Sequence, residues 1–184
     1  MNLLDKLKTI LPESQISNQI DHLKVVSEDE STLPGVIPLA VVWTETEQEI
    51  QKVVKFCFEN KIKLTTRGAG SALEGSTIPS EDGIVLDVSR MTKILEFWPD
   101  DLQVKVEPGL IYDNLNLKLK NDGLFFPPSP GGSGDIATIG GMVSTNASGI
   151  YSVKYGGTKE YILALEAITG TGEKITVGNR AVKR

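Results

Sequence analysis

Apolar residues in the first part of the chain alternate between short continuous runs and a helical repeat. Residues 39–43, LAVVW, form a run typical of a buried strand. Residues 44–61 repeat their apolar positions at helical intervals, and Thr46 followed by Glu49 has the spacing of a capping box. The predicted apolar face of this helix consists of Ile50, Val53, Val54, Cys57 and Phe58. Residues 62–66, IKLTT, are predicted to be the next strand, so we expect a βαβ unit with a right-handed crossover.

The rest of the chain predicts hairpins and one helix. The run GIVLDVSRM predicts a strand that ends near Asp87. Two β-rich runs around Pro99, in ILEFWPDDLQVKVEPG, predict a hairpin, and ILALEAITGTGEKITVG predicts another around Gly170 and Gly172. Between them, IYDNLNLKLKNDG is typical of a helix that Gly123 ends.

These elements predict an α+β fold in two lobes. The first lobe is a small βαβ lobe, and the second has a mostly antiparallel sheet with flanking helices. We expect the two lobes to join near residues 98–102. The predicted parts are an N-terminal helical arm over residues 1–30, a first lobe over 31–98 and a second lobe over 99–184. The acidic cluster Glu28, Asp29 and Glu30 is interpreted as a solvated loop.

Composition and charge exclude several classes of protein. The net charge of −5 and the absence of a basic stripe argue against nucleic-acid binding. A single cysteine, Cys57, forbids an internal disulfide, fits a reducing compartment and is predicted to pack in the core. No run approaches the about 20 apolar residues of a membrane span, and the N-terminus is too short and too charged for a signal peptide. We therefore expect a cytoplasmic protein, and peripheral attachment to a membrane through partners stays open.

Two glycine-rich tracts stand out, residues 65–75, TTRGAGSALEG, and residues 124–160. The first tract has the two-glycine spacing of a P-loop in Gly70 and Gly75, but Ser76 stands where the lysine is required. It also fails the dinucleotide fingerprint, because Leu73 is the sixth residue from the first glycine. In the second tract, GSGDIA fits that fingerprint loosely but follows PPSPG, which cannot be a central strand.

A looser mechanism fits the first tract. Successive backbone amides of a glycine-rich turn can form an anion-binding concavity, and ligands gather beyond the carboxyl ends of strands in open α/β sheets. The amides of residues 68–71, the Ser71 hydroxyl and the positive charge of Arg67 could bind a pyrophosphate. A plain surface turn, with Arg67 in a surface salt bridge, is the open alternative.

Residues 40–178 resemble the FAD-binding (PCMH-type) domain of the vanillyl-alcohol oxidase and p-cresol methylhydroxylase superfamily. The branch they resemble most is that of a glycolate oxidase subunit and of the D-lactate or D-2-hydroxyglutarate dehydrogenases. The resemblance is carried by the ordered series TRGAGSALEG, GIVLDVSRM, KVEPG, GLFFPPSP, ATIGGMVSTNASG and KYG, which together are specific although each alone is not.

The resemblance implies a division of labour between the two tracts. The first would wrap the FAD pyrophosphate with Arg67, Gly68, Ala69, Gly70, Ser71, Gly75 and Ser76. The second would run beside the isoalloxazine and ribityl chain with Pro128, Ser129, Ala137, Thr138, Gly140 and Gly141. Three further residues, Asn146, Ser148 and Gly149, would lie close to the cofactor. Neither His22 nor Cys57 matches a position of covalent attachment in the family, so we expect non-covalent FAD and no metal site.

The chain departs from the family at its end. Family members continue past a motif like the final GNRAVKR into another FAD-contacting segment and a substrate-binding cap domain. We therefore expect a second lobe that is incomplete at its C-terminus, an absent cap, and a chain that is inactive with substrate by itself.

The resemblance implies a flavin-dependent oxidoreductase that oxidises a small 2-hydroxy acid such as glycolate or D-lactate. The hydride would pass to FAD, and the electrons would pass to a quinone or a separate acceptor protein. The alternatives are an ether-lipid synthase-like transferase and a non-catalytic cofactor-binding domain. No catalytic base is identified, and Tyr112, Tyr151 and Tyr155 fit packing better than contact with the flavin.

Overall fold

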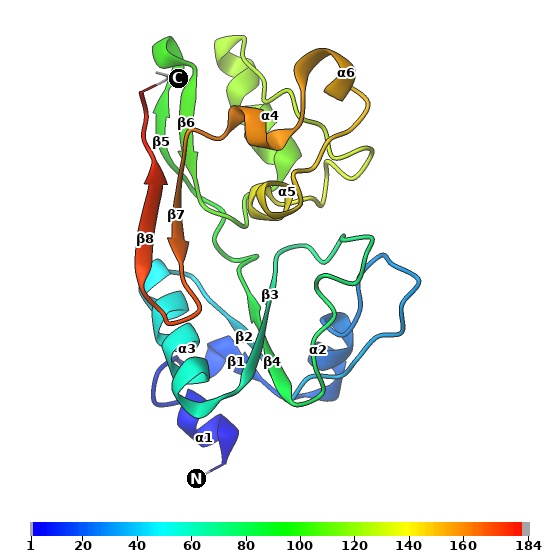
Figure 1. Cartoon of the computed structure of the whole chain (residues 1–184), viewed down its shortest axis with the longest axis vertical. Helices are drawn as coiled ribbons and strands as arrows, with labels where there is room; N and C mark the ends of the chain where they lie inside the picture. The colour runs from blue at the N-terminus through cyan, green and yellow to red at the C-terminus, as the bar shows by residue number, and fades with distance from the viewer. Residues whose placement is uncertain (1, 182–184) are drawn as a thin grey trace. The chain divides into compact units, whose positions relative to one another are not determined.

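The computed structural model describes residues 2–181, which fall into two compact units (Figure 1). Unit 1 consists of Met1–Arg90 with Leu163–Arg184, and unit 2 of Met91–Ile162. Both contain helices and strands, so the fold is α+β, as predicted. Of the final motif, residues 182–184 lie outside the described part of the chain.

Unit 1 is built on a four-stranded sheet in the order β1-β2-β4-β3. Its strands are β1 (Ile16–Ser17), β2 (Ala40–Trp43), β4 (Gly83–Asp87) and β3 (Lys63–Arg67). The last three run parallel, and their register aligns Trp43, Asp87 and Arg67 in one row at the carboxyl edge. The predicted βαβ unit is confirmed, but β4 lies between its two strands, a long-range pairing that no local pattern reveals.

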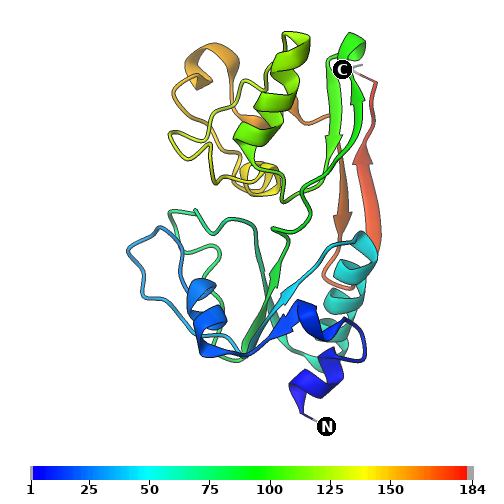
Figure 2. The ribbon, with the colours of Figure 1, turned by 180° about the vertical axis from the view of Figure 1, so that it is seen from behind.

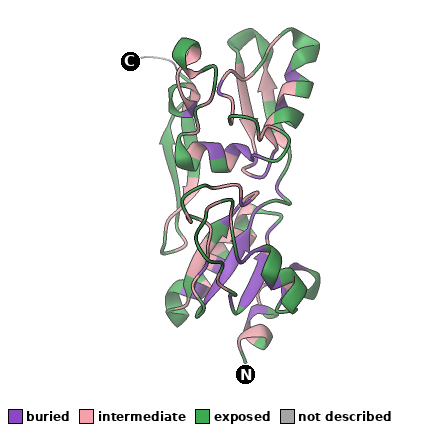
Figure 3. Ribbon diagram, turned by 90° about the vertical axis from the view of Figure 1, so that its right-hand side faces the viewer, coloured by how far each residue is buried: buried purple, intermediate pink, exposed green. Residues whose placement is uncertain are grey.

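Helices lie on both sides of this sheet (Figures 1 and 2). On one side, α2 (Ile20–Val25) contributes Leu23 to a cluster with Val41 and Val85. Because side chains alternate along a strand, Val42 and Leu86 face the opposite side, where α3 (Glu47–Asn60) lies. Strand β4 is buried along its whole length (Figure 3). The short helix α1 (Leu3–Leu7) precedes β1.

Helix α3 confirms its predicted start. The Thr46 side chain accepts a hydrogen bond from the Glu49 amide at 3.3 Å, and the Glu49 carboxylate accepts one from the Thr46 amide at 3.1 Å. Val53 and Cys57 are buried, as predicted, but Phe58 is 59% exposed. The helical repeat therefore identifies the centre of the apolar face and overestimates its width.

The structure places the unit boundaries differently from the predicted lobes. Residues 98 and 99 fall within one hairpin, because Trp98 pairs with Gln103, so the chain cannot divide there. The predicted N-terminal arm supplies β1 and α2 to unit 1. The C-terminal hairpin, β7 (Ala164–Ile168) and β8 (Lys174–Gly178), also belongs to unit 1, where Lys174 pairs with Glu47 of α3 at 2.8 Å.

Unit 2 combines an antiparallel hairpin with helices around one core. The hairpin is β5 (Ile94–Trp98) and β6 (Gln103–Val106), and α4 (Tyr112–Leu119) follows it. The second glycine-rich tract contains two helices that the sequence did not predict, α5 (Ile139–Thr145) and α6 (Ser152–Tyr155). The core contains Leu110, Leu115, Leu119, Ala137, Ile139 and Met142. Short 3-10 turns occupy Glu13–Gln15, Pro99–Asp101, Lys120–Asp122 and Thr158–Tyr161.

No helix within residues 2–181 is long and apolar enough to cross a membrane.

The buried thiol of Cys57 gives a direct test of the unit 1 core. Cys57 is 2% exposed, and burial raises the pKa of its thiol to about 11. Because the thiolate is the reactive form, we expect a disulfide reagent at pH 8 to modify Cys57 far more slowly in the folded protein than in guanidinium chloride. Equal rates in the two solvents would contradict the burial of Cys57 on the inner face of α3.

Candidate functional site

The first glycine-rich tract leaves the carboxyl edge of the unit 1 sheet. It begins at Arg67, the last residue of β3, and leads to β4. Gly70 and Gly75 have φ angles of +73° and +77°, in the left-handed region that favours glycine. The sequence therefore uses these glycines to turn the backbone at the edge where open α/β sheets bind ligands.

Four consecutive amides of this loop lack an acceptor within the described residues. The hydrogen bonds of the described chain include none donated by the backbone amides of Gly68, Ala69, Gly70 or Ser71. Gly70 is itself buried, and a buried amide without an acceptor costs free energy. The loop thus presents donors to an acceptor that the described chain does not supply, which fits an anionic group such as a diphosphate.

Arg67 lies in the interior and not on the surface. Its side chain is buried, with Nη1 donating to the Glu28 carbonyl at 2.7 Å and Nη2 to the Val25 carbonyl at 3.1 Å. Burial lowers the pKa of the guanidinium, and the charges of Asp87, Asp29 and Glu28 oppose that shift. The surface salt bridge considered from the sequence is therefore wrong for this residue.

The far part of the loop contacts the segment around Asp29. A Cβ atom at Gly75 would lie 2.5 Å from Cδ1 of Leu33, and Ser76 is exposed. The Asp29 carboxylate accepts a hydrogen bond from the Ser31 amide at 3.0 Å. Burial raises the pKa of Asp29, but interactions with Ser31 and with the nearby amides of Thr77 and Gly75 leave it below its ordinary value. The acidic cluster interpreted as a solvated loop thus includes a carboxylate that supports the glycine loop.

In the second tract, several predicted cofactor residues are paired within unit 2. Ala137 and Thr138 are buried, and Thr138 caps α5 by accepting from the Gly141 amide at 3.3 Å. The Gly140 amide donates to the Pro108 carbonyl at 2.8 Å. Pro128 is fully buried. In this structure the contacts of these residues stabilise the conformation of the tract within unit 2.

Another part of this tract, around Ser129 and residues 146–149, has backbone amides that could donate to a ligand. Gly149 packs so closely on the Ser129 carbonyl that a Cβ atom would overlap it. Asn146 ends α5 with a φ of 49°, and its Oδ1 accepts from the Lys159 amide at 2.9 Å. Within residues 2–181, the hydrogen bonds include none from the backbone amides of Ser129, Ser148 or Gly149, and Ser148 is exposed.

Sequence reasoning missed two supports of these tracts. Thr158 is fully buried, and its amide and hydroxyl both donate to the Ala147 carbonyl, at 3.1 and 2.6 Å. The carbonyls of Val25 and Glu28 are the other support. Backbone carbonyls leave no signal in a sequence, whereas Thr158 directly follows the matching stretch KYG and its glycines.

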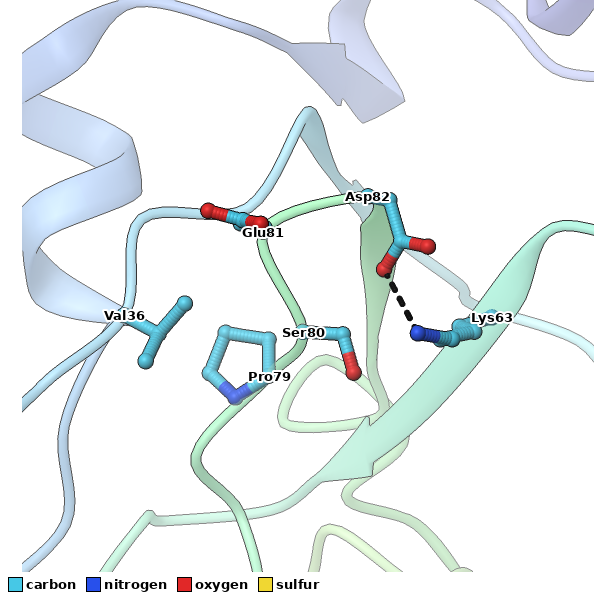
Figure 4. Close-up of a pocket in the computed structure, with 6 residues that line it drawn as sticks. All are labelled: Val36, Lys63, Pro79, Ser80, Glu81 and Asp82. Carbon is cyan, nitrogen blue, oxygen red and sulfur yellow. Dashed lines mark ion pairs between the residues drawn. The ribbon is translucent and has the colours of Figure 1, made fainter.

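A surface pocket elsewhere on unit 1 is lined by Val36, Lys63, Pro79, Ser80, Glu81 and Asp82 (Figure 4). Lys63 pairs with Asp82 at 3.0 Å, and both side chains are exposed. The pocket lies at the amino ends of β3 and β4, the edge opposite the glycine loop, and none of the predicted site residues lines it. Among the described residues, no cluster of His, Cys, Asp and Glu could hold a metal ion.

Curated relatives share most of this chain. It is 33% identical over 182 residues to a D-lactate dehydrogenase of Anaerostipes hadrus, a match that covers 96% of this chain and 37% of the relative. It is 35% identical over 159 residues to the glycolate oxidase subunit GlcD of Bacillus subtilis, covering 86% of this chain and 34% of the relative. The chain thus spans about a third of the length of these relatives.

Solved structures share the fold. Alkyldihydroxyacetonephosphate synthase superposes with a TM-score of 0.85 at 21% identity, over 98% of this chain and 35% of its own. A p-cresol methylhydroxylase structure superposes with a TM-score of 0.80 at 23% identity, over 95% of this chain and 34% of its own. At these identities the likeness establishes the architecture alone.

A family comparison covers most of both units. Residues 38–178 match the FAD binding domain family, a range that contains both glycine-rich tracts and every predicted site residue. The chain therefore belongs to the FAD binding domain family, with the α+β fold of the PCMH-type domains, and its cofactor is FAD.

Proposed function

We propose that this chain is the FAD-holding part of a flavin-dependent oxidoreductase that oxidises a small 2-hydroxy acid. The observation that carries the proposal is the run of four loop amides without an acceptor among the described residues, from Gly68 to Ser71, at the carboxyl edge of a parallel sheet. The relatives at 33–35% identity are a D-lactate dehydrogenase and a glycolate oxidase subunit, which supports this substrate class.

In this proposal the two tracts take separate tasks. The amides of residues 68–71, with Gly75 and Ser76, bind the diphosphate, since backbone donors give an anion several hydrogen bonds without side-chain bulk. The second tract, including Ser129, Ser148 and Gly149, provides backbone beside the flavin. When bound, FAD supplies the acceptor for a hydride from the α-carbon of the hydroxy acid. A quinone or a separate acceptor protein would then take the electrons.

The proposal includes non-covalent binding of FAD. The His22 ring nitrogen Nδ1 lies 2.8 Å from the Ser17 hydroxyl, and its ring packs edge-on against Trp43 at 5.5 Å. Cys57 is buried on the inner face of α3, and burial raises the pKa of its thiol. Since both groups are engaged in unit 1 packing, we expect acid precipitation of the loaded protein to release all of its FAD into the supernatant. A flavin that stays with the pellet would contradict this part of the proposal.

Reduction of the flavin tests the reaction itself. In a version of the protein that extends over the full length of its relatives, anaerobic addition of D-lactate or glycolate should bleach the visible absorption of bound FAD. A control addition of the L-enantiomer of lactate tests stereochemistry. The proposal fails if dithionite bleaches the flavin and no 2-hydroxy acid does. An ether-lipid synthase-like transferase is the alternative that this outcome would favour.

A further inference from the structure

A buried cation lies beside the glycine loop of unit 1. Arg67 is 8% exposed, although a charged side chain is rarely buried unless it is fully paired. Its two terminal nitrogens hold the carbonyls of Glu28 and Val25 at 2.7 and 3.1 Å. The Val25 carbonyl ends α2, 42 residues earlier in the chain, and the Glu28 carbonyl lies in the segment after it, 39 residues earlier.

The same guanidinium fills the space beside Gly70. A Cβ atom at Gly70 would overlap Cζ, Nη1 and Nη2 of Arg67. The absence of a side chain at this position thus admits the protein's own arginine. The conformation of Gly70, with a φ of +73°, and the position of the guanidinium therefore depend on each other.

The positive charge of Arg67 is balanced within unit 1. Asp87 is its register partner across β3 and β4, and it is buried. Asp87 and Asp29 both act on the guanidinium electrostatically. Asp29 in turn accepts from the Ser31 amide at 3.0 Å and interacts with the amides of Gly75 and Thr77. Two nitrogens of the guanidinium thus bind carbonyls within unit 1, and acidic groups of the same unit act on its charge, so its contacts are directed at the protein itself.

We propose that Arg67 is a positioning residue of the FAD site, which clamps the segment of Val25 and Glu28 to the glycine loop and does not itself bind the diphosphate. This inference rests on the proposed function in that the loop is taken to hold the diphosphate. It requires arginine and not merely a positive charge, because a lysine ammonium cannot hold two separate carbonyls with a planar fork.

The test uses Arg67→Lys in the whole chain, first without cofactor. We expect faster amide hydrogen exchange within residues 25–36, because the amides of Val26, Ser27 and Val36 are hydrogen-bonded there to backbone carbonyls. The matched control is Arg90→Lys, at an exposed arginine that pairs with Glu45 at 3.1 Å; this substitution should leave exchange in residues 25–36 unchanged.

Affinity measurements then distinguish whether Arg67 positions the loop or contacts the diphosphate directly. For Arg67→Lys we expect FAD and ADP to lose affinity by the same factor, about tenfold, because one buried carbonyl loses its partner. The slope of log Kd against log salt should match that of the wild type, since the number of charges at the diphosphate is unchanged. The same slope is expected for Arg67→Gln, which removes the charge.

Two results would overturn the clamp. One is wild-type exchange and wild-type affinity in Arg67→Lys, which would show that charge alone suffices. The other is a salt slope that falls in Arg67→Gln while exchange stays unchanged, which would show a direct phosphate contact. If the wild type bound no FAD, the exchange result would still decide the clamp, and only the assignment of the loop to the cofactor would fail.

Discussion

Replacing Gly70 with valine is expected to abolish retention of FAD. Gly70 has a φ of +73°, which costs a β-branched residue about 1–3 kcal/mol. The new side chain would also displace the Arg67 guanidinium and leave the carbonyls of Val25 and Glu28 without their partner, at a further cost of about 1–3 kcal/mol. The backbone of residues 68–71, which carries the four amides, would then be displaced.

The measurement is the Kd for FAD, followed by quenching of flavin fluorescence. A loss of about 3 kcal/mol corresponds to a weakening of about a hundredfold. Gly170→Val is the matched control, because a Cβ atom at Gly170 has nothing within 4 Å and the residue is not among the glycines of positive φ. A Gly70→Val protein that folds and binds FAD with wild-type affinity would show that this loop does not hold the diphosphate.

Local patterns in the sequence predict the elements of this fold well. The capping box of Thr46 and Glu49 and the hairpin turn at Pro99 involve residues close in the chain, so their interactions can be read from spacing. The helix α5 is an exception. Its segment contains Gly140 and Gly141, which weaken any helical signal, and it depends on the Thr138 cap and on packing in the unit 2 core.

Long-range contacts explain what the sequence could not predict. The bond from Gln51 to the Gly172 carbonyl joins residues 121 positions apart and helps place the last hairpin in unit 1. The same limit applies to the candidate site. Arg67 looks like a free cation beside a glycine loop when only its neighbours are read, yet its partners lie 39 and 42 residues away. The motif identifies the loop, while the role of each residue in it depends on the fold.

Substitution of the adjacent glycines of α5, Gly140 and Gly141, is expected to have a large effect on stability at the first position only. The reason is that Gly140 is tightly packed and Gly141 is not. A Cβ atom at Gly140 would lie 2.7 Å from Pro108 Cβ and 2.8 Å from the Pro108 carbonyl oxygen, whereas one at Gly141 would meet only the Thr138 hydroxyl oxygen, at 3.1 Å. Gly140→Ala should therefore push α5 away from Pro108, break the bond between the Gly140 amide and the Pro108 carbonyl, and destabilise the protein by about 1–3 kcal/mol.

Gly141→Ala is the matched control for stability and a separate test of the cofactor assignment. Gly141 is exposed in a helix, where alanine is favoured over glycine by about 1 kcal/mol, so the free energy of unfolding in urea should stay unchanged or rise. If the exposed face of α5 lies beside the flavin, this stable variant should still bind FAD more weakly.

Equal stability of the two alanine variants would contradict the close approach of α5 to Pro108. Unchanged FAD affinity in Gly141→Ala would instead confine the role of Gly141 to the helix.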